Sequence, residues 1–460
     1  MATLFNRNNG QAWRSYEKAI FRFVFIYFIL QSVPLDWKYF ANLLSINWLQ
    51  LGLNDFFNIS RYTPQLLGQE TTPDFWGLNT LGDWAIIALL SVVIAALWHW
   101  WEKRKPLRFS YDDLYYALRV ILRYRLALGV IAYGLIKVFP LQAPYPSISN
   151  LNTDYGDLAA WKIFVLSLGV APTFETFLGS LELLGGLLLL WRRTTALGAF
   201  LIVIFYGNVV LSNLAYEGNE TIYALYLLHI AGFLLLYDAQ RIINVFSLNR
   251  PGQPDTYRPN FAHAWQRNLR IGLKAFFVFL FIGVFGIQTY RAYGERPYHY
   301  PQANGLPDAS GIYNVQEFVW NGQARPYAKD DSVRWKDVVF ETWSTLSVKT
   351  AAPVIPWLGG IETIHSHDAD RLFELDGTQG RHYYHYTIDG DNQVLHLQNK
   401  NPHYPDDRFD VRYERPDVDT IILSGVTSSG DSLSVLLGRL DKKYLLEEVR
   451  KSGRRGGLVL

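Results

Sequence analysis

The sequence contains no cysteine, and Met1 is its only methionine. The absence of cysteine excludes disulfide bonds, thiolate metal ligands, iron–sulfur clusters and covalently attached haem in this chain. Charged residues are also scarce, at 18% of the chain, and the formal net charge is only +2. Because nucleic-acid binding requires a strongly basic surface, we expect no nucleic-acid partner.

Common catalytic motifs are missing as well. The chain has no Walker loop, no dinucleotide-binding glycine fingerprint, no nucleophile elbow and no H-E-x-x-H helix. Half of its 460 residues are hydrophobic. Long apolar runs fill the chain up to about Tyr290, and polar sequence with short alternating segments follows Arg291. This division predicts a membrane protein with a soluble C-terminal tail.

The apolar half contains about seven runs that we interpret as membrane-spanning helices, each near the minimum length for crossing a bilayer. They cover residues 20–34, 81–101, 126–140, 174–191, 195–214, 222–237 and 271–290. Asn and Asp interrupt the stretch from Ala41 to Gly68, so we expect short amphipathic helices on the surface there. The sequence therefore predicts an α-helical integral membrane bundle.

Basic residues gather on one side of these spans. They occur in the N-terminal segment, between Lys103 and Arg108, at Arg192 and Arg193, and between Arg241 and Arg270. The positive-inside rule places that side in the cytoplasm. We therefore expect a bacterial inner-membrane protein surrounded by lipid, with a cytoplasmic N-terminus and an extracytoplasmic tail.

The tail shows a strand pattern from Gly311 onward. Eight or so short segments rich in β-branched and aromatic residues are separated by turn signals such as Asn321-Gly322 and Asp376-Gly377. The pattern predicts an all-β barrel or sandwich. The segment Gly311–Phe318 resembles the first strand of lipocalin-like barrels. Such a barrel either holds an apolar ligand or is filled with side chains and serves as a docking domain.

The tail also carries several histidines. His365 and His367 would share one face of a strand, a spacing that can bind zinc. No reliable further ligand can be assigned, so ordinary surface histidines are the simpler interpretation of this pair and of the remaining ones, which are His382, His385, His396 and His403.

Glu182 is the principal candidate for chemistry, because an ionisable residue within an apolar span is costly and is retained mainly for a function. Helical spacing places it on one face with Glu175, Leu178, Gly185 and Gly186. The two glycines would allow another helix to approach closely. Glu182 either accepts protons or binds a quinone, or it forms a structural hydrogen bond to a neighbouring helix.

Other polar residues lie at similar depths in neighbouring spans. Glu182, Asn208 and His229 could form one polar layer, in which a His–carboxylate pair would exchange protons. Alternatively, His229 bonds a backbone carbonyl.

Lys137 could pair with Glu175 at the outer rim or extend to the membrane surface. We take Glu182 and His229 as candidate catalytic residues. One histidine supplies too few ligands for a metal. The candidate ligand-binding residues are Asn208, Tyr133, Lys137 and Tyr226.

Three segments resemble the DoxX family of small four-helix membrane proteins: Arg125–Pro140, Phe177–Ala199 and His229–Ile242. The family pattern falls on Arg125, Gly134, Lys137, Gly179, Glu182, Gly185, Gly186, Arg193 and Gly198. The family takes its name from a subunit of a thiosulfate:quinone oxidoreductase. The resemblance therefore implies a four-helix core and a possible link to the quinone pool, with quinone as a possible cofactor and a redox or envelope protein as a possible partner.

These observations divide the chain into four regions. Residues 1–115 hold two spans and an external amphipathic segment, and 116–246 form the DoxX-like domain. Residues 247–290 contain a basic loop and the last span, and 291–460 form the extracytoplasmic barrel. The favoured function is a redox-associated subunit that binds quinone or another lipophile. Lipid or partner binding by the barrel is the alternative, and transport is a third.

Overall fold

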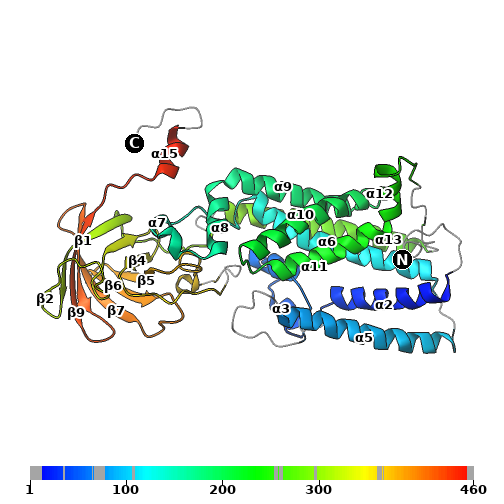
Figure 1. The fold of residues 1–460 in the computed structure, drawn as a ribbon, viewed down its shortest axis with the longest axis horizontal. Coiled ribbons are helices and arrows are strands. Elements are labelled where there is room, and N and C mark those ends of the chain that lie inside the picture. Colours follow the sequence, from blue (N-terminus) through cyan, green and yellow to red (C-terminus); the bar gives the residue numbers. More distant parts are fainter. Residues whose placement is uncertain are drawn as a thin grey trace. The chain divides into compact units, whose positions relative to one another are not determined.

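The structure, a computed structural model, describes residues 13–34, 37–64, 66, 78–105, 109–252, 257, 263–294, 298–359, 365 and 367–452. The chain forms two compact units (Figure 1). The helical unit comprises Met1–Phe139 and Glu175–Gly294, and the barrel unit comprises Pro140–Phe174 and Glu295–Leu460. The sequence-based division kept 140–174 within the DoxX-like domain, whereas the contacts of this segment group it with the barrel.

The helical unit is built around α6 (Tyr111–Val138), whose N-terminus is capped by Ser110. The Ser110 hydroxyl accepts a hydrogen bond from the Asp113 amide at 3.1 Å, which satisfies an amide that has no partner within the helix. The other helices in or entering this unit are α2 (Ser15–Ser32), α3 (Trp37–Ser45), α4 (Leu53–Ser60), α5 (Leu78–Glu102), α9 (Pro172–Leu189), α10 (Thr195–Ala215), α11 (Thr221–Tyr237), α12 (Ala239–Phe246), α13 (Ala264–Val278), the π-helical η2 (Phe279–Val284) and α14 (Phe285–Gly294).

Several of these helices are suited to a membrane. Three segments are long and apolar enough to cross it, namely Leu81–Glu102, Thr195–Ala215 and Ala264–Gly294, and the number rises to five if each of two bent helix pairs counts as one span. The predicted total of seven is not confirmed. Two of the predicted spans fall on α2 and α6, which carry charged residues such as Arg22 and Arg123 along their length. Such charges lower the hydropathy of a helix and add to the cost of inserting it in lipid.

Glycines bring α9 into backbone contact with α6. A Cβ added at Gly179 would lie 2.4 Å from the Val138 nitrogen, and one at Gly134 would lie 2.8 Å from the Leu183 nitrogen. On the same helix, Gly186 faces Ile131 of α6 and Gly185 faces Ile202 of α10. The close approach expected from the glycines is confirmed, and it places the α9 residue Glu182 between α6 and α10.

The barrel unit contains a closed antiparallel barrel. Its nine-stranded sheet has the order β2-β1-β3-β4-β5-β6-β7-β8-β9, and β9 pairs back with β1. The two-residue β2 pairs with β1 alone, so eight strands form the closed barrel. The strands are β1 (Gly311–Trp320), β2 (Gln323–Ala324), β3 (Asp337–Phe340), β4 (Thr345–Lys349), β5 (Arg381–Asp389), β6 (Val394–Asn399), β7 (Arg408–Glu414), β8 (Thr420–Val426) and β9 (Ser432–Arg439).

Large side chains fill the lumen of this barrel. Alternating positions along the strands point inward, and on β8 and β9 Ile421 lies opposite Leu437. The aromatic members of this core are Tyr313, Phe318, Trp335, Phe340, Tyr384, Tyr386 and Phe409. Closure removes exposed sheet edges, and the packed core supplies hydrophobic stabilisation. The predicted all-β tail is therefore a side-chain-filled barrel.

Short helices accompany the barrel. They are α7 (Ile148–Leu151), the 3-10 helix η1 (Tyr155–Asp157), α8 (Ala160–Val170), the 3-10 helix η3 (Asp368–Asp370) and α15 (Leu445–Ser452). The backbone of the segment 140–174 also bonds the barrel unit directly, because the Ala159 amide donates to the Gly377 carbonyl at 2.8 Å. These contacts explain why a loop between two predicted spans belongs to the barrel unit.

Candidate functional site

The Glu182 carboxylate is buried and neutralised within the helical unit. The Lys137 ammonium of α6 donates to Glu182 Oε2 at 2.7 Å, and the Tyr206 hydroxyl of α10 donates to Oε1. The Glu182 side chain has 0% exposure and that of Lys137 has 13%. The Lys137 ammonium also lies 5.5 Å from the ring centres of Tyr133 and of Phe205. A positive charge and a hydroxyl thus contact the carboxylate, and two aromatic rings lie beside the ammonium.

A second ion pair lies near the first. Arg61, which follows α4, contacts Glu220 Oε1 at 2.6 Å, and Glu220 precedes α11. The Tyr133 hydroxyl donates to Glu220 Oε2 at 2.8 Å. The Arg61 and Glu220 side chains are 31% and 14% exposed, so this pair reaches the surface of the helical unit.

Arg125 carries a further buried positive charge. Its guanidinium donates to the Ser60 carbonyl at 3.1 Å and also to the Tyr62 carbonyl. The Tyr223 hydroxyl donates to the same Ser60 carbonyl at 3.2 Å. The ring of Tyr226 lies 5.2 Å from the guanidinium carbon. Main-chain carbonyls and aromatic rings therefore stabilise this charge, and they fix the end of α4 against α6 and α11.

The predicted site residues separate into two groups. Glu182 and Lys137 are paired, and Tyr133 contacts Lys137. The sequence did not predict that Lys137 pairs with Glu182. The Tyr226 hydroxyl donates to the Gln31 carbonyl at 2.8 Å. Tyr226 thus fastens α11 to α2 at a different place in the unit.

His229 and Asn208 do not join Glu182 in one polar layer among the contacts that the structure describes. The His229 ring stacks on Phe28 of α2, with ring centres 5.0 Å apart, and it meets Tyr27 edge-on at 5.6 Å. Both His229 and Asn208 have exposed side chains. Similar depth in a span did not imply proximity, because α11 directs His229 toward α2 while α9 directs Glu182 toward α6 and α10.

Three partners in this network were missed from the sequence. Tyr206 is a hydroxyl-bearing residue within an apolar helix, and that signal was available. Arg61 and Glu220 flank helices α4 and α11 and are 159 positions apart in the sequence. Nothing in the local sequence pattern links them, so their pairing required the fold.

The barrel unit contains a separate buried polar cluster. Glu341 accepts hydrogen bonds from the amides of Ile148 at 3.1 Å and Ser149 at 2.7 Å. Glu374 pairs with Lys400 at 3.3 Å, and both side chains have 0% exposure. Burial, followed by the nearby Glu374 charge, raises the pKa of Glu341 to about 7. These groups join the 140–174 segment to the strands.

The histidines of the tail do not converge. His396 contacts Asp410 at 2.8 Å, and His385 contacts the Ser344 carbonyl at 3.0 Å. Within the described ranges, no group of three His, Cys, Asp or Glu side chains is placed to hold a metal ion. Ser366, between His365 and His367, lies outside the described residues.

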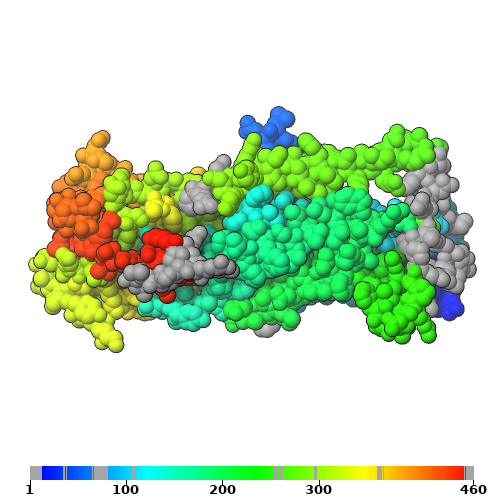
Figure 2. All heavy atoms as spheres, turned by 90° about the horizontal axis from the view of Figure 1, so that it is seen from above, coloured from blue at the N-terminus to red at the C-terminus, as the bar shows by residue number. Residues whose placement is uncertain are grey.

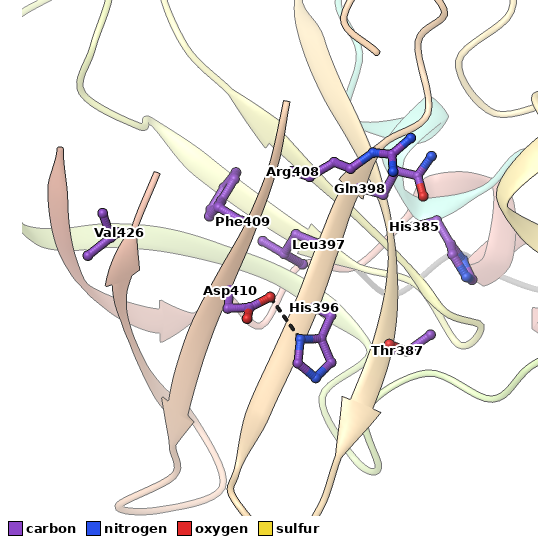
Figure 3. Close-up of a pocket in the computed structure, with 9 residues that line it drawn as sticks. All are labelled: His385, Thr387, His396, Leu397, Gln398, Arg408, Phe409, Asp410 and Val426. Atoms are coloured by element: carbon purple, nitrogen blue, oxygen red, sulfur yellow. Dashed lines mark hydrogen bonds and ion pairs between the residues drawn. The ribbon is translucent and has the colours of Figure 1, made fainter. Parts of the chain in front are cut away.

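One shallow hollow lies on the outer face of the barrel, where β5, β6 and β7 run side by side (Figure 3). Its volume is about 700 Å³. Pairing between the strands places His385, Gln398 and Arg408 in one row, and Thr387, His396 and Asp410 in the next. The hollow therefore presents polar and oppositely charged groups beside the apolar side chains of Leu397, Phe409 and Val426.

Comparison with known proteins gives no family assignment: no family model, curated protein or solved structure matches this chain. The interpretation of the site therefore depends on the residues and their geometry.

Proposed function

We propose that this protein is a DoxX-like, multi-pass membrane protein that binds a quinone or similar lipophile beside Glu182 and exchanges protons with it. The observation that carries the proposal is the buried arrangement of Glu182, Lys137 and Tyr206. Buried ionisable groups in a membrane domain are costly, and they commonly mark a proton or substrate site.

The chemistry of the three side chains suits a quinone. Reduction of a quinone to a quinol consumes two electrons and two protons. Lys137 and Tyr206 offer donors for the quinone oxygens, and Glu182 can return protons to them. The electrons would come from a redox protein partner.

The surface above this site supports entry from the lipid. The view in Figure 2 shows α9 and α10, coloured teal to green, on one face of the helical unit. Large apolar side chains are exposed along these two helices, among them Phe177, Leu184, Ile204 and Leu211. A lipophile dissolved in the bilayer would meet this surface first.

Quinone binding can be tested with the purified full chain in lipid nanodiscs, by titration with a short-chain benzoquinone. Tyr206→Phe and Glu182→Gln should each weaken binding about tenfold or more, because a hydrogen bond that involves a charged group contributes about 1.5–3 kcal/mol. Asn208→Leu, on the exposed side of α10, is the matched control and should bind as the unchanged protein does. Equal affinity in all four proteins, or no saturable binding, would refute the proposal.

The proposed location is the bacterial inner membrane, with the N-terminus in the cytoplasm and the barrel outside. The basic sequence around α12 and before α13 supports this orientation through the positive-inside rule. The absence of cysteine permits a direct measurement. In spheroplasts, an impermeant thiol reagent should label Ser332→Cys in the barrel unit and leave Ser247→Cys unlabelled until the membrane is opened. Labelling of both from outside would contradict the orientation.

Partner binding by the barrel is a second candidate, and one observation favours it over lipid capture in the lumen. The lumen is filled by buried side chains, whereas the outer face of β5 to β7 has a hollow with exposed polar groups. A filled barrel is suited to docking a redox or envelope protein through its outer surface.

A further inference from the structure

Tyr133 contacts two of the ion pairs of the helical unit, Glu182–Lys137 and Arg61–Glu220. Its hydroxyl donates to Glu220 at 2.8 Å, and its ring lies 5.5 Å from the Lys137 ammonium. Tyr133 and Lys137 are four residues apart on α6, so they occupy the same face of that helix. The buried Glu182–Lys137 pair is thus connected through one tyrosine to the Arg61–Glu220 pair.

The two ends of this connection differ in their exposure at the surface of the helical unit. The Glu182 side chain has 0% exposure, whereas the Glu220 and Arg61 side chains are 14% and 31% exposed. Proton transfer between a buried group and water requires intermediate groups that can both donate and accept. A tyrosine hydroxyl can do both, and Glu220 is already its acceptor.

We propose that Glu220, reached through Tyr133, is the group through which the Glu182–Lys137 pair exchanges protons with the aqueous phase. This inference rests on the proposed proton exchange at Glu182. The Tyr133 proton moves to the Glu220 carboxylate, and Tyr133 takes a proton from the Lys137 ammonium. Lys137 recovers its proton from protonated Glu182, and Glu220 releases one to water. One proton enters the relay and one leaves it, with no change of redox state.

The relay requires a movement that the side chains allow. The Lys137 ammonium lies over the ring of Tyr133 rather than at its hydroxyl. Lysine has a long flexible stem, so rotation about its side-chain bonds can carry the ammonium from the ring to the hydroxyl. Arg61 would hold Glu220 in position, since its contact with Oε1 leaves Oε2 for Tyr133.

The test measures protonation of Glu182 in the full chain by infrared spectroscopy after a rapid pH jump, without any quinone. The Glu182 signal is assigned by its loss in Glu182→Gln. Tyr133→Phe and Glu220→Gln should slow its relaxation at least tenfold, and the signal should still reach the amplitude seen in the unchanged protein. Glu217→Gln, an exposed carboxylate in the same loop, is the matched control and should relax at the unchanged rate.

The rate and the final amplitude separate a relay from a structural role. A purely structural contribution of Tyr133 would alter the final protonation of Glu182 without slowing the approach to it. Relaxation at one rate in all four proteins would overturn the relay, as would a Glu182 signal that never responds to pH. Quinone binding is measured separately, by titration. Failure of the relay would leave the relaxation rate unchanged in the variants, whereas failure of the binding proposal would appear as equal affinity or no saturable binding in the titration.

Discussion

Lys137→Met is expected to destabilise the helical unit by about 3–5 kcal/mol, the range for breaking a buried ion pair by removing one partner. The substitution leaves Glu182, whose side chain has 0% exposure, buried without its cation. The Tyr206 hydroxyl remains as a donor but carries no charge. The loss should appear as a lower midpoint of unfolding when the full chain, in mild detergent, is titrated with sodium dodecyl sulfate.

The opposite substitution should cost less, and the double substitution should recover much of the loss. Glu182→Gln leaves Lys137, whose side chain is 13% exposed and can extend toward the surface. Lys137→Met combined with Glu182→Gln removes both charges, so no uncompensated charge stays buried. Lys103→Met, at an exposed position after α5, should leave the midpoint unchanged. Equal and additive losses for both single substitutions would contradict the buried pair.

The sequence was informative about helix α9, where a carboxylate and two glycines interrupt an apolar run. A carboxylate within an apolar helix identified Glu182, and adjacent glycines predicted a close helix contact that the structure confirms at Gly185 and Gly186. Spacing along α9 could not identify the partner helix. The residue that neutralises Glu182 is Lys137, which lies 45 positions away in the sequence, and helix rotation in the bundle decides that pairing.

Rotation also explains why His229 and Asn208 lie elsewhere. The sequence predicts both within apolar helices at a depth similar to that of Glu182, but depth fixes only one of the coordinates that place a side chain. Hydropathy has a similar limit for counting spans. It responds to charges in α6, such as Arg123 and Arg125, but not to the packing that buries them.

In the tail, alternation predicted strands, and closure into a barrel depended on the long-range pairing of β1 with β9. The role of the 140–174 segment was not predictable from its polar composition. Ser149 and Glu341 are 192 positions apart. Because this contact is buried, the segment contributes to the stability of the barrel unit, and tests of that unit require the full chain.

The barrel unit is expected to lose stability between about pH 4.5 and pH 7 through Glu341, whose pKa is raised from its ordinary value of 4.5 to about 7. The folded form binds this proton more tightly than the unfolded chain does. The contribution of Glu341 to the free energy of unfolding is therefore complete below pH 4.5 and is lost as the pH rises through 7. A shift of this size corresponds to about 3 kcal/mol. Hydrogen exchange of the β3 and β4 amides in the full chain, corrected for intrinsic rates, measures it.

Glu341→Gln distinguishes this titration from a general effect of pH. Glutamine keeps one oxygen that can accept from one of the Ile148 and Ser149 amides, but it turns an N–H toward the second amide. That second amide loses its acceptor, so stability should fall at acidic pH. Its pH slope should nevertheless flatten, because the titrating group is gone while Glu374 and Lys400 remain. Glu414→Gln, at an exposed position on β7, should keep the slope of the unchanged protein. A slope that survives Glu341→Gln would assign the pH dependence to another group. It would also indicate that the two amide hydrogen bonds, which stabilise the ionised carboxylate, offset the burial that raises the pKa of Glu341.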